Sequence, residues 1–265
     1  MKLTGSTHIA ESADQLYDDL ASAVITSAFA AIRSRGAFHL ALSGGRTPEP
    51  FYMRLVIDPR YRVMPWSMTH VWQVDERRVP ADDEQSNMKM IREVLVDHVS
   101  IRGRQVHAID ALADDAATRY EAALREVIAE EVVGQTKIPR LDFVLLGMGA
   151  DGHTASLFPR SPALADRQRW IVTNDGPPEV PGGLAGARLT MTYPLLNAAR
   201  KVVVLVTGQD KTETLRRVAD HLRDHGPDAE ALPITAVQPQ PYGGELVWYL
   251  DSAAAGHADS ALPEV

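Results

Sequence analysis

Residues 141–159 read LDFVLLGMGADGHTASLFP, an apolar run followed by a glycine-rich segment. Its first part, LDFVLL at 141–146, is short and almost continuously apolar, which is typical of a strand that is buried on both faces. Glycines follow at 147, 149 and 152, and glycine lets the backbone come close to a ligand. The stretch therefore predicts an inner strand of a mainly parallel sheet that ends in a functional loop.

The same arrangement, an apolar strand followed by a polar or glycine-rich segment, recurs three more times. The pairs are AFHLAL before SGGRTP (43–48), MTHVWQV before DERR (75–78), and KVVVLV before TGQDK (207–211). Helical patterns separate them, and strands that alternate with helices indicate a parallel sheet covered on both faces. We predict a three-layer, Rossmann-like α/β sandwich. Ligands bind beyond the carboxyl ends of such strands, so the four segments should converge on one crevice.

Helix signals complete the pattern. Ser12 and Gln15 form a capping box at the start of the first helix, and Gly36 ends it. Pro48 suits the first turn of a second helix, and Ser86 or Asn87 can cap a third that runs to about Val99. Further helices are predicted over 114–133 and from Lys211 to about Leu222. The Pro- and Gly-rich residues 174–187 read as a surface loop.

No linker divides the chain, so residues 1–250 are predicted to form one α/β domain, followed by a disordered tail over 251–265. The net charge of -8 and the lack of basic runs disfavour nucleic acid and anionic membranes as partners. There is no cysteine, which excludes disulfides and thiolate catalysis. No signal or membrane-spanning pattern occurs, and a cytoplasmic location is the default expectation. The sequence leaves monomer and homodimer equally open.

Two of the strand-end segments suit an anionic ligand. Ser43, Gly44 and Gly45 join a strand to a helix, where backbone N–H groups can bind a phosphate or sugar hydroxyl, although a plain tight turn is an equal alternative. It is not a Walker A loop. In DERR, Arg77 can bind phosphate with a fork of donors, and Asp75 can accept from sugar hydroxyls or orient a histidine. A solvated charge run is the alternative there.

The glycines of 147–152 formally match the GxGxxG dinucleotide fingerprint. That interpretation needs a crossover helix directly afterwards. Pro159 and Pro162 leave little chain for such a helix, which makes a nicotinamide site a weak hypothesis.

His153 follows these glycines, beside Asp151 and Thr154. Histidine has an unperturbed pKa near 6.5, which suits a general base at neutral pH. A structural core histidine is the alternative. The other histidines are scattered without metal-ligand spacing, and no GxSxG nucleophile elbow occurs, so we expect neither a metal nor a serine hydrolase. Lys211 at a helix start and Arg188 are further candidates for phosphate, each against a solvated alternative.

Taken together, the segments resemble the 6-phosphogluconolactonase family of the glucosamine/galactosamine-6-phosphate isomerase superfamily, whose fold is shared with glucosamine-6-phosphate deaminase. Residues 141–159 carry the family's most specific signature. LALSGGRTP resembles its usual SGGSTP turn, with Arg46 in place of the common serine. VDERRVPADDEQSN resembles its DER…HPDSN stretch, with Glu84 and Gln85 as departures, and further likeness lies in RLTMTYPLLNAA and VTGQDKTETL.

The resemblance implies hydrolysis of 6-phospho-D-glucono-1,5-lactone to 6-phosphogluconate in the oxidative pentose phosphate pathway, without metal or cofactor. It implies that His153 activates water and that Asp75 orients or binds the sugar-phosphate lactone. It also implies a set of residues that hold the phosphate or the developing carboxylate: Ser43, Gly44, Gly45, Thr47, Arg77, Asp151, Arg188 and Lys211.

Two rivals remain. The deaminase branch uses a carboxylate five residues after the histidine, where this chain has Phe158, so the acid/base capacity for ring opening with amine loss is missing. A sugar-phosphate-sensing regulator of the same fold would carry a DNA-binding module. The strand pattern begins within the first 45 residues and the chain is acidic, which disfavours that hypothesis.

Overall fold

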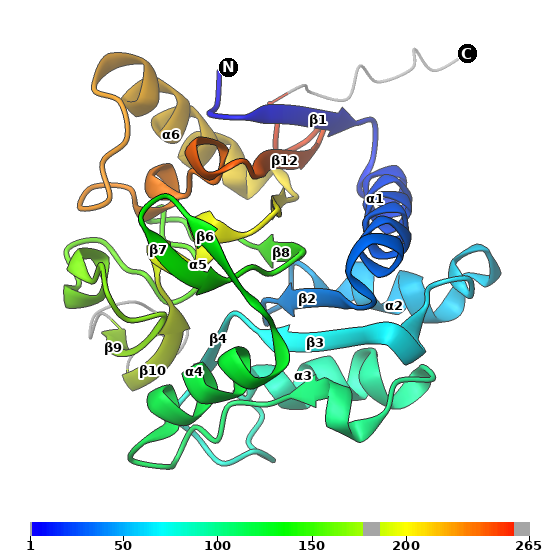
Figure 1. Ribbon diagram of the computed structural model, residues 1–265. Helices are drawn as coiled ribbons and strands as arrows, with labels where there is room; N and C mark the ends of the chain where they lie inside the picture. Colours follow the sequence, from blue (N-terminus) through cyan, green and yellow to red (C-terminus); the bar gives the residue numbers. More distant parts are fainter. Residues whose placement is uncertain (1, 177–185, 257–265) are drawn as a thin grey trace, which may run out of the picture.

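A seven-stranded parallel sheet forms the centre of the protein in the computed structural model, which describes residues 2–176 and 186–256 (Figure 1). The strand order is β1-β12-β11-β8-β2-β3-β5, and every paired neighbour is parallel. The strands are β1 (Ser6–Ala10), β2 (Phe38–Leu42), β3 (Thr69–Gln73), β5 (Val106–His107), β8 (Phe143–Leu146), β11 (Lys201–Val206) and β12 (Glu245–Asp251). The predicted α/β class is confirmed.

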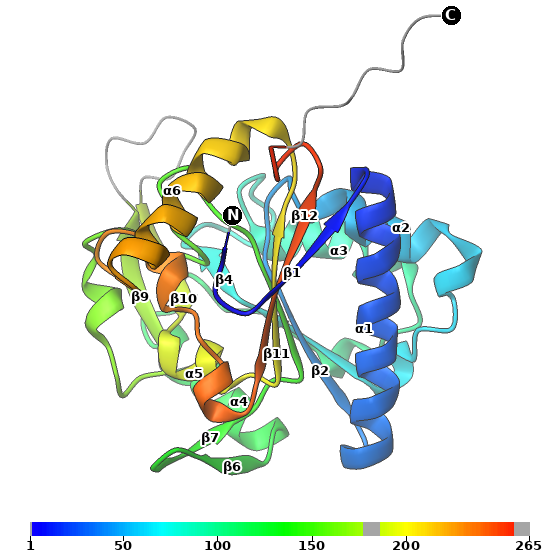
Figure 2. The ribbon, with the colours of Figure 1, turned by 90° about the horizontal axis from the view of Figure 1, so that it is seen from above.

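Helices cover both faces of this sheet (Figure 2). One face carries α1 (Ala13–Arg35), α2 (Glu49–Ile57) and α3 (Asn87–Val94), and the other carries α4 (Ala116–Val127), α5 (Tyr193–Ala198) and α6 (Thr212–Asp224). Side chains along the inner strands alternate between two separate hydrophobic clusters. In β8, Phe143 and Leu145 join the cluster under α1, α2 and α3, whereas Val144 and Leu146 join the cluster under α4, α5 and α6. A continuously apolar strand therefore contributes to two cores.

The helix caps are as predicted except that Gln15 Oε1 accepts from the N–H of Glu11, so the capping box with Ser12 is only half formed. Ser12 accepts from the N–H of Gln15, at 3.2 Å, and Gly36 ends α1 with a left-handed φ of 85°. Ser86 caps α3, which stops at Val94, and a 3-10 turn at Val96–His98 completes the predicted length. Other 3-10 turns lie at Pro59–Tyr61, Trp66–Met68, Gly103–Gln105, Pro162–Ala165, Gln209–Lys211, Pro233–Ala236 and Gln240–Tyr242. Within the described ranges, no helix has the length and apolar character needed to cross a bilayer.

The strand order reverses between β2 and β8. From β2 the chain proceeds outward through β3 and β5, whereas from β8 it proceeds the other way through β11 and β12. In open α/β sheets the loops at such a reversal diverge, and the crevice between their strands binds ligands. The segments after β2 and β8 are SGGRTP and the glycine-rich histidine loop.

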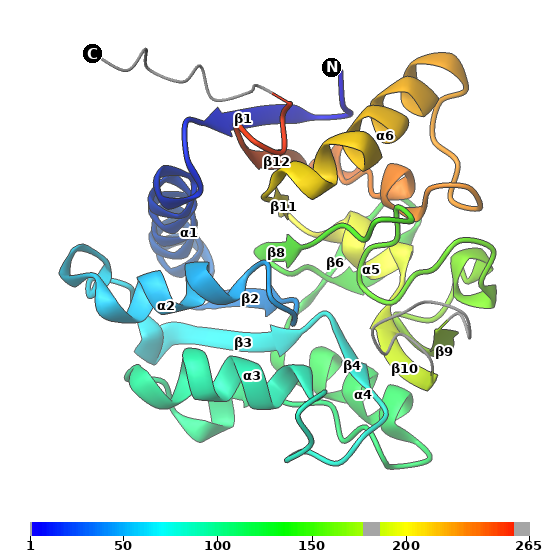
Figure 3. The same cartoon turned by 180° about the vertical axis from the view of Figure 1, so that it is seen from behind.

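A second, antiparallel sheet lies at the end of β3 (Figure 3). Its strands are β4 (Asp75–Arg77), β10 (Gly186–Met191) and β9 (Ile171–Gly176). In the antiparallel register of β4 and β10, Arg77 lies directly opposite Arg188. The prediction of a loop over 174–187 is therefore wrong at both ends, where the backbone is paired; residues 177–185 lie outside the described chain.

Two other predictions are wrong. The helix over 114–133 ends at Val127, and residues beyond it form a hairpin of β6 (Glu130–Val133) and β7 (Thr136–Pro139) around Gly134, because β-branched residues favour the extended backbone. The tail does not begin at 251. Asp251 ends β12 and accepts from the N–H groups of Gly208 and Ala254, and Ala254 is fully buried. Residues 257–265 lie outside the described chain.

Three histidines cluster around Trp72 at the β2–β3–β5 side of the sheet. His70 Nδ1 lies 2.9 Å from His107 Nε2, the Trp72 indole donates to His39, and the His107 ring stacks on Trp72. Burial, followed by the neighbouring histidines, lowers the pKa of His39 to about 3. Burial also lowers the pKa of His107 to about 4 and that of His70 below its ordinary value.

We predict that this cluster destabilises the fold in acid. The folded pKa values lie below the unfolded value near 6.5, so the unfolded chain binds protons first as the pH falls. Stability should be complete above pH 6.5 and decline from there towards pH 4 and below, by up to about 1.4 kcal/mol per pH unit for each such histidine. Urea unfolding at a series of pH values measures this slope. In the His39→Gln variant, whose side chain keeps an acceptor for Trp72, the slope should be shallower; an unchanged slope would show that His39 does not contribute.

Candidate active site

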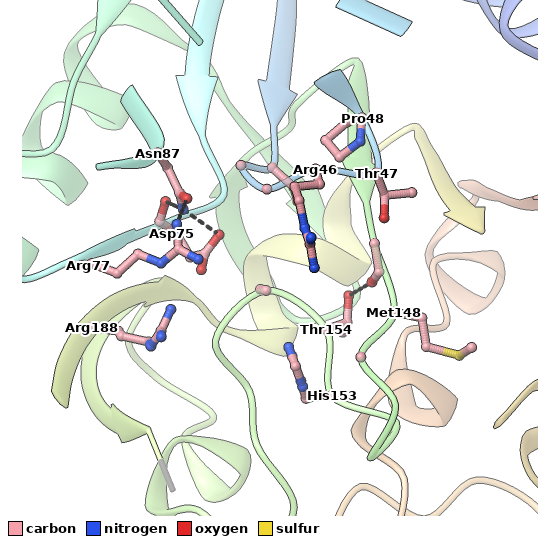
Figure 4. A pocket seen from close by; sticks show the side chains of 16 residues that line it. Arg46, Thr47, Pro48, Asp75, Arg77, Asn87, Met148, His153, Thr154 and Arg188 are labelled. Carbon is pink, nitrogen blue, oxygen red and sulfur yellow. Dashed lines mark hydrogen bonds between the residues drawn. The ribbon is translucent and has the colours of Figure 1, made fainter. Parts of the chain in front are cut away.

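A pocket opens where the strand order reverses. Its volume is about 180 Å³, and its walls come from the turn after β2, from β4, from the start of α3, from the loop after β8 and from β10 (Figure 4). The lining residues are Ser43, Gly44, Gly45, Arg46, Thr47, Pro48, Asp75, Arg77, Asn87, Gly147, Met148, Gly149, His153, Thr154, Ala155 and Arg188. Three of the four predicted strand-end segments therefore meet here.

Most of the predicted site residues line this pocket, with two differences. Asp151 lies behind His153 rather than in the wall, and Lys211 is outside the lining set. The Nζ of Lys211 lies 3.8 Å from Asp210 Oδ2. Lys211 precedes α6, whose Thr214 donates to the carbonyl of Ala150, so this helix start packs on the histidine loop. A role for Lys211 in the site stays a prediction.

The sequence interpretation missed several lining residues. Arg46, Met148 and Thr154 belong to the SGGRTP and GMGADGHT segments, but neither segment predicts a role for them. Asn87 was considered only as a helix cap. Its place in the DEQSN segment, beside the DER residues that it contacts, was the available signal.

His153 and Asp151 form a close pair in the loop after β8. The Nδ1 of His153 lies 2.6 Å from Asp151 Oδ1, and the same oxygen accepts from the His153 backbone N–H at 3.1 Å. Burial raises the pKa of Asp151, but the hydrogen bonds and charge of His153 outweigh it, so the net shift is downward. An ionised Asp151 fixes a proton on Nδ1 and leaves Nε2 as the acceptor of the neutral ring.

Glycines make room for this pair. A Cβ on Gly149 would lie 2.1 Å from His153 Nδ1, and one on Gly44 would lie 1.9 Å from Asn87 Oδ1. Gly45 has a φ of 92°, which only glycine adopts without strain. In the SGG and GMG segments, glycine therefore leaves room for the pocket side chains of Asn87 and His153, which lie against the backbone.

Asp75 is held by three hydrogen bonds from two side chains. Ser156 Oγ donates to Asp75 Oδ2 at 2.6 Å, and the Asn87 amide donates to the Asp75 carbonyl at 2.8 Å and to Oδ1 at 3.3 Å. Ser156 is fully buried and lies three residues after His153. The carboxylate thus joins β4 to the histidine loop and faces the pocket in a fixed orientation.

Glu76 has a structural role although it stands between two site residues. It is 2% exposed and accepts from Gln73, Ser86 and the backbone N–H groups of Arg77, Asn87 and Met88. A carboxylate at the start of α3 satisfies the free N–H groups of its first turn. In the DERR cluster, Asp75 and Arg77 therefore line the pocket, whereas Glu76 stabilises the fold.

Arg77 and Arg188 lie on neighbouring strands at one side of the pocket. Arg77 donates to the carbonyl of Gln85 and to Asn87 Oδ1, while its buried Nε has no partner among the described residues. Arg188 is 3% exposed, and its guanidinium lies 5.6 Å from the centre of the Phe158 ring. Burial, followed by the charge of Arg77, lowers the pKa of Arg188. Two cations this close favour binding of an anion.

The turn after β2 is rigid. Ser43 Oγ donates to the Leu145 carbonyl at 2.8 Å, and the Tyr52 hydroxyl donates to the Ser43 carbonyl at 2.7 Å. Burial raises the pKa of Tyr52 well above its ordinary value, so the phenol remains a donor. The Ser43 side chain is thus committed to the fold, and what the turn can offer a ligand is backbone N–H groups and the side chains of Arg46 and Thr47.

Comparisons with known proteins agree with one another. The family model described as glucosamine-6-phosphate isomerases/6-phosphogluconolactonase matches residues 11–248. The chain is 34% identical to "Probable 6-phosphogluconolactonase 2" of Oryza sativa subsp. indica, over 98% of this chain and 92% of the relative. It is 39% identical to the 6-phosphogluconolactonase of Nostoc sp., over 87% and 89%. The solved 6-phosphogluconolactonase from Trypanosoma cruzi superposes with a TM-score of 0.82 at 25% identity, covering 98% of each chain.

Proposed function

Because the chain belongs to the glucosamine-6-phosphate isomerase/6-phosphogluconolactonase family, we propose that it hydrolyses 6-phospho-D-glucono-1,5-lactone to 6-phospho-D-gluconate, in the oxidative pentose phosphate pathway. The observation that carries this proposal is the His153–Asp151 pair at one wall of a pocket whose other walls carry arginines. The pair can activate water, and the arginines can bind a phosphate. A phosphorylated ester substrate needs both.

His153 acts as the general base in this proposal. The Nδ1–H group of the ring is hydrogen-bonded to Asp151. The ring accepts a proton from water at Nε2, and the oxygen of that water adds to the lactone carbonyl carbon. Negative charge then develops on the carbonyl oxygen, where hydrogen-bond donors stabilise it. The ring C–O bond breaks, and the imidazolium returns the proton to the departing ring oxygen. A lactone is an activated ester, so no covalent nucleophile is required.

The substrate phosphate binds on the arginine side of the pocket. Arg77 and Arg188 are neighbours in its wall, and the turn at residues 43–47, which can supply backbone N–H donors, lines the same space. Lys211 extends this group if its side chain turns from Asp210 toward the loop at 149–151. Asp75, held by Ser156 and Asn87, accepts from sugar hydroxyls.

The composition of the His153 surroundings disfavours amine loss. Phe158 occupies the position five residues after His153, and its ring lies 4.9 Å from the imidazole. An aromatic ring cannot exchange a proton with a sugar ring oxygen, which the isomerisation step requires. The lactonase reaction needs only one proton carrier.

A coupled assay tests the function. Glucose 6-phosphate dehydrogenase produces the lactone in situ, and 6-phosphogluconate dehydrogenase reports its hydrolysis as NADPH. The purified protein should accelerate the second step well above spontaneous hydrolysis. With glucosamine 6-phosphate as the control substrate, no ammonia should be released. Ammonia release without lactone hydrolysis would reverse the assignment.

We predict that Arg188→Ala and Lys211→Ala raise KM more than they lower kcat, because a phosphate is bound in the ground state and in the transition state alike. For the buried Arg188 the increase should be about 10- to 100-fold, as expected for loss of charge-assisted hydrogen bonds. Steady-state kinetics with the coupled assay measures both constants.

Lys201→Ala is the matched control, since Lys201 begins β11 at the opposite end of the sheet and pairs with Glu245. It should retain the parent KM. A parent-like KM in the Lys211 variant would remove Lys211 from the phosphate site, and the same result for Arg188 would remove Arg188.

A further inference from the structure

Arg46 lies in the turn between β2 and α2, and its side chain extends into the pocket toward the loop that carries His153 (Figure 4). The residue is exposed. In the described part of the chain it makes no hydrogen bond or ion pair, unlike Arg77, whose Nη1 is bound to Gln85 and Asn87. Arg46 therefore has its full set of donors available to a ligand.

The described lining of the pocket carries more positive than negative charge. Three guanidinium groups line it, from Arg46, Arg77 and Arg188, and among the described lining residues Asp75 is the single carboxylate. Both Asp75 oxygens already accept hydrogen bonds from Ser156 and Asn87, and the nearby Asp151 is paired with His153. The protein as a whole is acidic, with a net charge of -8, so this local excess of positive charge is specific to the pocket.

We propose that Arg46 is a specificity-determining residue that binds the phosphate of the substrate and so makes this enzyme selective for phosphorylated over unphosphorylated lactones. This inference rests on the proposed lactonase function. The lactone ring is neutral, and the phosphate is the one dianionic group of the substrate, so a third arginine gains most from contact with it. An arginine fork can bind two phosphate oxygens together.

Arg46 is the most accessible of the three pocket arginines. Arg77 and Arg188 are held within the protein, whereas Arg46 stands on a rigid turn with a free side chain at the pocket mouth. Being exposed, it has its charge solvated before binding, and its removal leaves no cavity and no unpaired partner in the described structure. A variant at this position should therefore fold like the parent and report on binding alone.

The test compares phosphorylated with unphosphorylated lactone in three variants. Arg46→Ser restores the serine of the SGGSTP turn, Arg46→Lys keeps the charge without the fork, and Arg78→Ser is the matched control. Arg78 is exposed, contacts Asp114 and does not line the pocket, so this variant removes an equal charge close by. The substrates are 6-phosphogluconolactone and glucono-1,5-lactone.

For Arg46→Ser we expect kcat/KM to fall about 10-fold or more on 6-phosphogluconolactone, the lower range for an exposed charge-assisted hydrogen bond, with the loss mainly in KM. The value on glucono-1,5-lactone should stay within twofold of the parent. Arg46→Lys should lie between, and Arg78→Ser should match the parent on both substrates. Equal losses on both lactones would place Arg46 at the carbonyl end and overturn the proposal, as would no loss on either.

Calorimetric titration with inorganic phosphate gives a second readout that does not depend on turnover. The dissociation constant of the parent should rise about 10-fold in Arg46→Ser and remain unchanged in Arg78→Ser. If the parent lacks lactonase activity, the proposed function fails, yet this titration still decides whether Arg46 binds phosphate. Equal phosphate affinity in the parent and in Arg46→Ser overturns the present proposal alone.

Discussion

Replacing His153 with alanine is expected to lower kcat on 6-phosphogluconolactone by about 10²- to 10⁴-fold, the usual contribution of a positioned general base. KM should change little, because in the proposed binding mode the arginines and the turn after β2 hold the phosphate without the imidazole. The side chain is 18% exposed in a loop outside the sheet, and its loss leaves both hydrophobic clusters intact. Initial rates from the coupled assay measure the effect, after subtraction of spontaneous hydrolysis.

A surface histidine provides the control for this experiment. His98 is exposed in the 3-10 turn after α3, where its ring contacts the Glu93 carbonyl, and His98→Ala should retain the parent kcat. Circular dichroism and thermal unfolding should be the same for both variants. A His153→Ala enzyme that turns over at the parent rate would show that another group activates water, and Asp75 would then be the first candidate.

The role of Asp151 follows from the same pair. Asp151→Asn keeps the size of the side chain but removes the charge that fixes a proton on Nδ1, so a smaller loss than in His153→Ala is expected. The two residues are coupled, and their effects should not add when combined.

The central part of the fold was predictable because its strands are apolar on both faces. LDFVLL and KVVVLV cannot lie on a surface, and each is followed by the glycine or polar residues that end a strand. The edge and accessory strands gave no such signal. β1 has the burial pattern of an exposed edge, and β4 is three residues long and pairs with β10, which lies more than 100 residues later. Pairing of this kind depends on the tertiary fold and not on local sequence.

The candidate site likewise contains residues that the local sequence predicts and residues that only the tertiary fold brings together. Residues that belong to one local motif, such as His153 with Asp151 or the Ser43 turn, could be selected from spacing and residue type. The contact between Asp75 and Ser156 joins residues 81 positions apart, and the contact between Gly44 and Asn87 depends on how α3 packs on the turn after β2. The structural role of Glu76 was not predictable from the sequence for the same reason. Only its burial at the start of α3 distinguishes it from the neighbouring Asp75, which faces the pocket.

The pocket also explains why an acidic protein can bind an acidic substrate. Its arginines come from three separate segments, after β2, in β4 and in β10, and the sheet reversal brings these segments together. The carboxylates nearby are occupied by Ser156, Asn87 and His153 rather than by the arginines. Among the described residues, Arg46 in particular keeps its charge available to a ligand, whereas many surface arginines are paired with Asp or Glu.

The second large effect is expected from Gly149→Ala, which adds one methyl group and removes no polar atom. The new Cβ would lie 2.1 Å from His153 Nδ1 and 2.7 Å from Asp151 Oδ1, far inside van der Waals contact. The imidazole must move, and the 2.6 Å contact with Asp151 must lengthen or break. Displacement of a catalytic group by about 1 Å can cost about 10²-fold, so we expect kcat/KM to fall by about that factor.

This loss should occur without a general change in the fold or in phosphate binding. Gly103→Ala is the matched control, since a Cβ there meets nothing within 4 Å, and it should behave as the parent does. In Gly149→Ala the free energy of unfolding should change by less than about 1 kcal/mol, because side chains at the pocket can shift into open space. The affinity for inorganic phosphate should remain, as it depends on the arginines. Parent activity in this variant would show that the observed His153–Asp151 geometry is not the one used in catalysis, whereas loss of hydrolysis with retained phosphate binding would separate the base from the phosphate site within one pocket.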